Sequence, residues 1–555
     1  MSDPTMYDAT MYDATTETPV LERTVACVLD KQVTAQPEKI ALVDVEGRAL
    51  TFAQVADSAY RIATSFAQAG LQRQDLVLMM MDNHIDTALT WIGLNVGAFA
   101  AVPINTAYKG QILAHVASNS GARVAVVEGG YLDRFAALRE ELPDLETIYV
   151  RGEPNAEVAA GIVVRDFAEL LTAPPQRPET PPHVSEISTV IYTSGTTGPS
   201  KGALCPHGHT FQMSAAFRYP TTDADVIMIN TPLFHAMGLL TGVYTGLRGG
   251  ATVVIPGPFS ASGFWGVVRR FGVTQTVIVG AQADFLWRQP ATDTDADHTL
   301  RNMIVVPALP YLKEFGERFG IEVWSAYGQT ETGITTLTDP GEVRPFLCGR
   351  PRPFIDLKLV DDNDSEVPQG QVGEIVVRSS EPFSMMRGYH RMPEETVAVW
   401  RNLWMHTGDS AYMDPDGRII FVDRKKDALR CRGENVSSLE VEGCIAQQPG
   451  VALAAVIAVK GTSSEDEIKA FLQPQPDVEI DLEILLKSLV DKLPYFMVPR
   501  YYEVVAALPL TPQMKVQKAQ LRAERGGITP GTWDCQAHGW LVARDGLRTI
   551  EPKLS

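Results

Sequence analysis

The sequence predicts an α/β protein: a large, multi-layered N-terminal domain of α/β sheets with a β-rich subdomain, followed by a small α+β C-terminal domain. Three observations indicate this class. Short apolar runs rich in β-branched residues alternate with segments of helical periodicity over residues 17–180 and 184–354, as in strand–helix layers. The pattern becomes β-rich over residues 355–423. A chain of 555 residues can form at least two domains with separate cores.

The first part of the chain contains both segments typical of strands and a segment with helical periodicity. Residues 37–43 lead into a strand, and residues 122–128 are typical of a buried strand. Residues 51–70 predict an amphipathic helix, because apolar side chains recur at helical spacing at Phe52, Val55, Ala59, Ile62, Phe66 and Ala69. Such a stripe more often faces a core than a ligand.

Residues 87–104 contain no charged side chain over 18 positions, which is the lower limit for a membrane span. The segment also contains Asn95, two glycines and Pro103. These residues favour a buried helix that leads into a strand over a transmembrane segment.

Further strands are predicted by apolar runs in the middle of the chain, at residues 187–191, 226–229, 251–255, 321–326, 355–360 and 374–378. The sequence Asp-Pro-Asp-Gly at 414–417 predicts a turn between two strands. A charged run at 423–427 follows this β-rich part and marks the predicted hinge between the domains.

The predicted boundaries follow from these changes of pattern. We expect a disordered tail over residues 1–16, which carry a tandem Met-Tyr-Asp-Ala-Thr repeat, and an N-terminal domain over residues 17–425. A C-terminal domain is expected over residues 426–524, and residues 525–555 form an extension without an assigned structure.

Composition excludes several classes of function. The formal net charge of -19 argues against nucleic acid as a partner, because a polyanion binder needs a basic surface. None of the six cysteines has the Cys-x-x-Cys spacing, so neither a zinc site nor a disulfide framework is predicted. The N-terminus lacks the basic and apolar regions of a signal peptide. Together these features favour a cytoplasmic protein.

The strongest functional signal is Tyr-Thr-Ser-Gly-Thr-Thr-Gly-Pro-Ser-Lys-Gly at residues 192–202, directly after a predicted strand. Glycines let the backbone N–H groups approach a ligand, and hydroxyls and a lysine bind phosphate oxygens. The segment is not a Walker A loop, because its lysine lies three residues beyond Gly198 and is followed by glycine. It predicts a site for a nucleoside triphosphate.

Three other segments are weaker when taken alone. Residues 327–331, Tyr-Gly-Gln-Thr-Glu, offer a ring that can stack on a base and a carboxylate that can hold Mg²⁺; alone they indicate a turn with a buried tyrosine. Residues 404–409 end in Asp409, a residue type suited to ribose hydroxyls. Residues 508–515 place Lys515 on a loop.

In this order and spacing, the four segments resemble the adenylate-forming superfamily of acyl-CoA synthetases, luciferases and peptide-synthetase adenylation domains. The resemblance covers roughly residues 20–525. Residues 423–442 are most similar to the crotonobetaine/carnitine-CoA ligase branch and related acid–CoA ligases. Membership would imply a large AMP-binding domain and a mobile C-terminal domain, with ATP, Mg²⁺, CoA and a small-molecule carboxylic acid as ligands.

The resemblance implies roles for the matching residues. The β- and γ-phosphates would be bound by Thr193, Ser194, Gly195, Thr196, Thr197 and Lys201. Mg²⁺ would be held by Thr196 and Glu331. The rest of the nucleotide would be contacted by Tyr327, Gly328, Gln329 and Thr330, with Asp409 and Arg424 on the ribose.

Further roles concern the acid and the two half-reactions. Lys515 would contact the substrate carboxylate and the α-phosphate, and His235 in the gate motif at 232–235 would line the acyl pocket or the pantetheine tunnel. Lys426 would be the hinge residue. Gly433 and Glu434 would face the active site in the thioester-forming state. The implied catalytic residues are Lys515, Glu331, Thr196 and His235.

Three departures from the family pattern stand out. The usual Gly-Gly-Ala-Pro adenine loop is replaced by Val-Pro-Ala-Leu-Pro at 306–310. Gln513 and Met514 precede Lys515 where Thr-Gly is usual, and Arg432 replaces the first glycine of a Gly-Gly pair.

Three functions remain open from the sequence. The first is an AMP-forming acid–CoA ligase. The second is an adenylating enzyme with another acceptor: an amine, a carrier protein, or nitrite in a diazotisation. The third is a non-catalytic nucleotide-binding regulator. The presence of Lys515, Glu331 and Asp409 together argues against it, because a binding module has no need of the lysine. The sequence does not determine which carboxylic acid is the substrate. A homodimer is possible, but the sequence does not determine the oligomeric state.

Overall fold

The computed structural model describes residues 14–155, 161–193, 199–217, 219–339, 341–342, 344–424, 429–431, 434–436, 438–460, 466–511, 514–543 and 546–551. The chain forms two compact units. Unit 1 comprises residues up to 358 together with 376–407 and 417–419, and unit 2 comprises residues 359–375, 408–416 and those from 420 onward. The chain passes between the units within four strands of the β-rich part, which are β18 (Ile355–Val360), β19 (Gly373–Ser379), β21 (Trp404–Met413) and β22 (Ile419–Arg424).

Unit 1 contains two seven-stranded sheets. In the first, the strands β1, β10, β11, β12, β13 and β14 run parallel and β2 pairs antiparallel at one edge. The order across this sheet is β14 (Glu322–Trp324), β13 (Asn302–Val306), β12 (Gln275–Val279), β10 (Val226–Ile229), β11 (Thr252–Ile255), β1 (Ile40–Asp44) and β2 (Ala49–Thr51).

The second sheet is built in the same way, with β9 as the antiparallel edge strand. The order across it is β7 (Val163–Asp166), β6 (Thr147–Arg151), β5 (Val124–Glu128), β3 (Leu76–Met80), β4 (Ala100–Pro103), β8 (Ile187–Thr193) and β9 (Lys201–Pro206).

The helices of unit 1 that matter for its layers are α2 (Val25–Ala35), α3 (Phe52–Gln68), α4 (Ile85–Val96), α5 (Gly110–Ser120), α6 (Leu132–Ala136), α7 (His207–Ser214), α8 (Ala236–Gly238), α9 (Thr245–Gly249), α10 (Phe264–Phe271), α11 (Gly280–Trp287) and α12 (Leu312–Phe319). A short helix, α1 (Ala14–Glu17), lies at the start of the described chain. Its Thr15 is fully buried and accepts a hydrogen bond from Arg352 Nη2 at 3.3 Å, so ordered contacts begin within the predicted tail.

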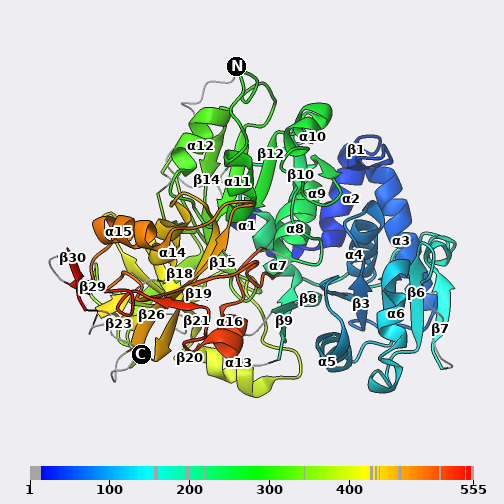
Figure 1. The fold of residues 1–555 in the computed structure, drawn as a ribbon. Helices are drawn as coiled ribbons and strands as arrows, with labels where there is room; N and C mark the ends of the chain where they lie inside the picture. The colour runs from blue at the N-terminus through cyan, green and yellow to red at the C-terminus, as the bar shows by residue number, and fades with distance from the viewer. Residues whose placement is uncertain are drawn as a thin grey trace. The chain divides into compact units, whose positions relative to one another are not determined.

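Helices separate the two sheets and cover their outer faces (Figure 1). One core packs α2, α3 and α4 between the sheets, with Leu42 from the first sheet and Val77 from the second. A second core packs α5 and α6 on the other face of the second sheet. A third packs α10, α11 and α12 on the other face of the first sheet. The predicted multi-layered α/β class is therefore confirmed.

Apart from the strand predicted at residues 321–326, the predicted elements of unit 1 are confirmed with small changes at their ends. The uncharged segment at 87–104 forms the buried helix α4 and the buried strand β4. The predicted stripe on α3 is buried from Phe52 to Phe66, whereas Ala69 is exposed because the helix ends at Gln68. Within the described part of the chain, no helix has the length and apolar character of a membrane span.

One expectation was wrong: residues 321–326 do not form a single strand. β14 ends at Trp324 and a separate strand, β15 (Ala326–Gln329), begins after Ser325. Ser325 N donates to Thr338 Oγ1 at 2.9 Å, and Ser325 Oγ donates to Val305 O at 2.8 Å. These bonds take the place of ladder bonds, so the chain leaves the parallel sheet and enters an antiparallel one formed with β16 (Gly333–Leu337) and β17 (Leu347–Pro351).

Unit 2 has an α+β fold. Its main sheet has the order β25 (Val451–Lys460), β26 (Asp466–Pro474), β27 (Tyr501–Val504) and β28 (Thr532–Asp534). Three helices, α14 (Ser438–Ala446), α15 (Leu482–Lys492) and α16 (Lys518–Arg525), accompany this sheet, with the hairpins β23–β24 (Leu429–Cys431, Glu434–Val436) and β29–β30 (Trp540–Ala543, Gly546–Thr549). The C-terminal extension thus supplies the edge strand β28.

A buried ion cluster fixes this extension in unit 2. Lys469 and Glu503, both with almost no exposed side-chain area, pair at 2.7 Å. Lys469 Nζ also donates to Gly527 O at 2.8 Å, and Thr529 Oγ1 donates to Glu503 Oε2 at 2.8 Å. Because buried charges are tolerated only when paired and hydrogen-bonded, these contacts hold the chain that leads into β28.

Burial lowers the pKa of His207, the first residue of α7, to about 4, and neither ring nitrogen has a hydrogen-bond partner among the described residues. The unfolded chain takes up a proton near pH 6.5 and therefore binds more protons than the folded protein between pH 6.5 and 4. The contribution of this group to the free energy of unfolding, roughly 3 kcal/mol, is present above pH 6.5 and lost as the pH falls to 4.

We therefore expect the thermal midpoint of a His207→Asn variant to fall less steeply than that of the wild type as the pH is lowered from 6.5 to 4. The measurement is a series of thermal unfolding scans across this range. Equal slopes for the two proteins would contradict the assignment of the buried neutral ring to His207.

Candidate active site

The phosphate-loop motif lies between β8 and β9 at one edge of the second sheet. Thr193, the last residue of β8, is paired with Lys201, the first residue of β9. Residues 194–198, which include the predicted ligands Ser194, Gly195, Thr196 and Thr197, lie outside the described residues. The predicted strand before the motif is confirmed as β8.

Helix α5 holds both ends of this loop. Tyr192 OH donates to Asn119 Oδ1 at 2.6 Å on the entry side. On the exit side, His115 Nε2 lies 2.9 Å from Ser200 O. Both contacts come from residues of one helix, so α5 fixes where the motif leaves and re-enters the sheet.

Glu331 is the centre of a polar cluster in unit 1. Its Oε1 accepts hydrogen bonds from Thr193 Oγ1 at 3.2 Å and from Tyr389 OH at 3.0 Å. Two predicted site residues from motifs 138 positions apart are thus brought together. Burial, and then the Glu331 carboxylate, raise the pKa of Tyr389, so this phenol stays protonated and donates to Glu331.

Sequence reasoning did not find Tyr389. It follows Gly388 in the segment between β19 and α13 (Pro393–Val399), where no local pattern marks a ligand. Its place depends on β9, because Arg387 N donates to Leu204 O at 2.9 Å and His390 N to Gly202 O at 2.7 Å.

Lys201 lies beside this cluster. Its Nζ is 5.3 Å from the centroid of the Tyr389 ring and forms an ion pair with Glu395 of α13. The Glu395 side chain is 49% exposed, so this pair is open to solvent and weak. Lys201 is therefore available to an anionic ligand.

The Tyr-Gly-Gln-Thr-Glu segment is the end of β15 and the start of the turn to β16. Tyr327 is 8% exposed, as expected for a buried tyrosine. A Cβ at Gly328 would lie 2.2 Å from Gly333 O, so only glycine fits there. Gln329 Nε2 donates to Thr407 O at 2.9 Å, which ties this hairpin to the chain that precedes Asp409.

His235 lies at the start of α8, where its Nδ1 accepts a hydrogen bond from Met237 N at 3.3 Å. The residues before it are held by Asn83, whose amide donates to Thr231 O at 3.1 Å and accepts from Leu233 N at 2.8 Å. The gate segment is thereby fixed, and the role of His235 at an acyl pocket remains a prediction.

The other predicted residues belong to unit 2. Asp409 is 4% exposed and lies in β21, after Gly408, whose N–H donates to Glu374 Oε1 at 3.1 Å. The backbone of Arg424 ends β22, and that of Glu434 begins β24. Lys426 and Gly433 lie outside the described residues.

Lys515 is exposed, and its backbone bonds to Thr511. Thr511 N donates to Lys515 O at 2.7 Å, and Lys515 N donates to Thr511 Oγ1 at 3.1 Å. Met514 has a φ of 60°, a left-handed conformation that favours glycine. The backbone therefore keeps the form that a glycine would adopt, although the residue is methionine.

A network in unit 2 connects this region with the predicted hinge. Lys518, at the start of α16, contacts Ser438 Oγ at 2.5 Å and Glu442 Oε1 at 2.8 Å. Ser438 N and Oγ donate to Asp423 Oδ2 at 2.9 and 2.6 Å. The segment before Lys426 and the helix after Lys515 are thus held together.

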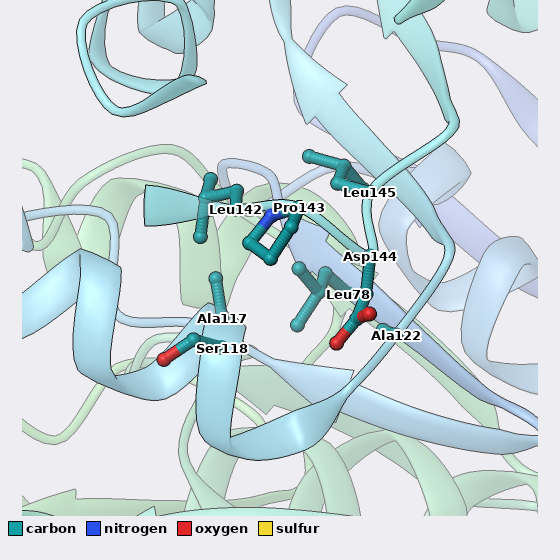
Figure 2. Close-up of a pocket in the computed structure, with 8 residues that line it drawn as sticks. All are labelled: Leu78, Ala117, Ser118, Ala122, Leu142, Pro143, Asp144 and Leu145. Atoms are coloured by element: carbon teal, nitrogen blue, oxygen red, sulfur yellow. The ribbon is translucent and has the colours of Figure 1, made fainter. Parts of the chain in front are cut away.

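Figure 2 shows a small pocket between α5 and the turn at 142–145, with Ser118 and Asp144 as its polar side chains. Its lining residues are Leu78, Ala117, Ser118, Ala122, Leu142, Pro143, Asp144 and Leu145. None of the predicted site residues lines it, so this pocket does not mark the site.

Comparison with known proteins points to one family. Residues 29–390 match the AMP-binding enzyme family, and residues 440–515 match the AMP-binding enzyme C-terminal domain. The chain is 29% identical to a crotonobetaine/carnitine–CoA ligase of Salmonella paratyphi A over 504 residues, covering 87% of this chain and 96% of the relative. The corresponding ligase of Salmonella typhi is 29% identical over 501 residues, with the same coverage.

Solved structures agree with this result. The anthranilate CoA ligase AuaEII in complex with anthranoyl-AMP has a TM-score of 0.82 and 25% identity, covering 92% of this chain and 98% of its own. A benzoate CoA ligase from Burkholderia xenovorans has a TM-score of 0.79 and 24% identity, covering 90% and 99%; it supports the fold alone. With its four motifs and its two-unit α/β fold, the chain belongs to the adenylate-forming AMP-binding enzyme family.

Proposed function

We propose that the protein is an ATP-dependent, AMP-forming carboxylic acid–CoA ligase. The observation that carries this proposal is the cluster in unit 1, where Glu331 accepts hydrogen bonds from Thr193 and Tyr389, with Lys201 beside it. Two of its members, Thr193 and Lys201, are paired where β8 and β9 flank the loop of the phosphate-loop motif. Relatives named as CoA ligases and a structural neighbour with a bound acyl-adenylate support the choice of reaction.

In the first half-reaction, a carboxylate oxygen of the acid attacks the α-phosphorus of ATP. A P–O bond forms, the bond to pyrophosphate breaks, and an acyl-adenylate results. The protein forms no covalent bond, so positioning and charge neutralisation dominate catalysis. Thr193, Lys201 and the loop residues 194–197 would hold the leaving pyrophosphate, and Thr330 and Lys515 would contact the α-phosphate.

Glu331 is suited to hold Mg²⁺, because it offers a carboxylate next to hydroxyl groups, and Mg²⁺ prefers a few carboxylate oxygens together with phosphate oxygens. Thr196 is the second proposed ligand. When bound, the ion would neutralise charge on the phosphates. Tyr327, Gly328 and Gln329 would border the adenine side, and Asp409 and Arg424 would hold the ribose.

In the second half-reaction, the CoA thiol attacks the acyl carbon of the adenylate, AMP leaves and a thioester forms. Gly433 and Glu434 would face the active site in this state, after rotation about Lys426. We propose the domain boundaries 17–425 and 426–524 for the two parts that rotate, and His235 as the residue beside the acyl group.

The test is to incubate the protein with Mg-ATP and a panel of carboxylic acids, with and without CoA, and to measure pyrophosphate, AMP and thioester. We expect acid-dependent pyrophosphate release, with AMP and thioester formed only when CoA is present. Pyrophosphate release that is independent of CoA would favour another acceptor. No release with any acid would favour a nucleotide-binding regulator over the ligase.

A Lys515→Ala variant should lose about 10²–10³-fold in adenylation, because a charge-stabilising contact to the α-phosphate is removed. Thioester formation from supplied acyl-adenylate should stay close to the wild-type rate. The two half-reactions are measured separately, and Lys487→Ala, which removes an exposed lysine of α15 in the same unit, is the control. Equal losses in both half-reactions would rule out this role.

A Glu395→Gln variant removes the counter-ion of Lys201. We expect the KM for Mg-ATP to fall by about 1.5- to fivefold, because an exposed ion pair typically contributes about 0.2–1 kcal/mol. Glu394→Gln, which removes the same charge from the preceding position of α13, is the matched control. An unchanged or higher KM in the Glu395 variant would mean that Lys201 does not bind the nucleotide.

A further inference from the structure

Helix α7 begins directly after β9, the strand that leaves the phosphate-loop motif. All eight of its residues are buried. Two of them, His209 and Gln212, carry polar side chains that contact the β15–β16 hairpin. Residues three positions apart lie on the same side of a helix, so one face of α7 contacts the hairpin that carries Glu331.

His209 is fully buried, and both of its ring nitrogens lie against backbone carbonyls. Nε2 is 2.8 Å from Thr330 O, and Nδ1 is 2.9 Å from Ser384 O. Two residues earlier on the same helix, the equally buried His207 has no such contact among the described residues. The contacts of His209 are therefore specific to its position and do not follow from burial alone.

Gln212 contacts the other side of the hairpin. Its Nε2 donates to Ile334 O at 2.8 Å, and its Oε1 accepts from Ile334 N at 3.3 Å. A Cβ at Gly333, whose φ is 70°, would lie 2.2 Å from Gln212 Oε1. The left-handed φ favours glycine where the hairpin meets α7, and the hairpin is held on both sides of its turn.

The two carbonyls that His209 contacts belong to the two segments that hold Glu331. Thr330 immediately precedes Glu331 in the chain. Ser384 precedes Met386, whose N–H donates to Glu331 O at 3.0 Å, and Tyr389, whose hydroxyl donates to the Glu331 carboxylate. One buried ring therefore lies between both segments behind this carboxylate, and its single N–H donates to one of the two carbonyls.

We propose that His209 is a positioning residue for adenylation, which sets the place of Thr330 and Glu331 relative to Thr193 and Lys201. The inference rests on the proposed function of this site. His209 acts through Thr330 O and not on the substrate, and α7 connects it to the strand that begins with Lys201. Nucleotide binding and the first half-reaction depend on this contact, and thioester formation does not.

Two substitutions of His209 test its contacts with Thr330 O and Ser384 O separately. In His209→Gln, the side-chain amide nitrogen can take the place of Nε2 and donate to Thr330 O. In His209→Asn, the shorter side chain can take the place of Nδ1 and donate to Ser384 O, which leaves Thr330 O without its partner. His207→Asn is the matched control, because it alters a buried histidine of the same helix without either contact.

The first readout is the Kd of Mg-ATP measured by calorimetry, which requires no acid. We expect His209→Asn to weaken binding by about 10–100-fold, the loss seen when a partner that orients a metal ligand is removed, and His209→Gln to stay within about fivefold of the wild type. Adenylation should follow the same order. Thioester formation from supplied acyl-adenylate should change less than twofold in every variant.

A merely structural role gives a different result: both His209 variants and the His207 control would lose both half-reactions in proportion to their fall in thermal midpoint. Equal Kd values for His209→Asn, His209→Gln and the wild type would also overturn the proposal, as would a wild-type protein that does not bind Mg-ATP. If the wild type binds Mg-ATP but activates no acid, the proposed function fails, and the two Kd values still decide the role of His209.

Discussion

The pairing of β9 with β8 is the constraint on which the candidate site in unit 1 depends. It places Lys201 opposite Thr193 and determines which face of the strand each side chain occupies. The other edge of β9 bonds to the segment at 387–390, which brings Tyr389 to Glu331. Because side chains alternate along a strand, a slip of one residue would turn Lys201 to the opposite face. One edge strand thus sets the geometry of four polar side chains.

The layers of unit 1 hold this strand in place. The core between the two sheets is apolar and closely packed around α3 and α4, so the sheet to which β9 belongs cannot shift without disturbing it. On the outer face, α5 adds specific polar contacts to both ends of the loop motif. These contacts fix the backbone positions of Tyr192 and Ser200, on either side of residues 194–198.

Electrostatics in this protein act locally. The net charge is -19, and Lys201, the proposed phosphate-binding lysine, has a half-exposed counter-ion, Glu395. In the proposed function, an incoming phosphate replaces the Glu395 carboxylate at little cost, because an exposed ion pair is weak. The buried charges of unit 2 have close partners instead. Lys469 and Glu503 form an ion pair with each other, and each also takes part in a further hydrogen bond.

The sequence by itself determined the fold class, the order of elements and the family. Runs of β-branched residues and helical stripes predict β8, α3 and α4 because burial acts on local periodicity, and the loop motif is recognisable because its glycines and hydroxyls are consecutive. It also singled out Thr193, Lys201 and Glu331, although not their distances.

Only the tertiary structure decided which residues hold Thr193, Lys201 and Glu331 in place. Tyr389 and His209 reach Glu331 and Thr330 across 58 and 121 positions of the chain, and neither lies in a local pattern that marks a ligand. Ser325 likewise ends one strand and starts another through bonds to Val305 and Thr338. Contacts of this kind depend on how sheets and helices pack. The partners of these side chains are close in space but far apart in the sequence, so a local sequence pattern does not reveal them.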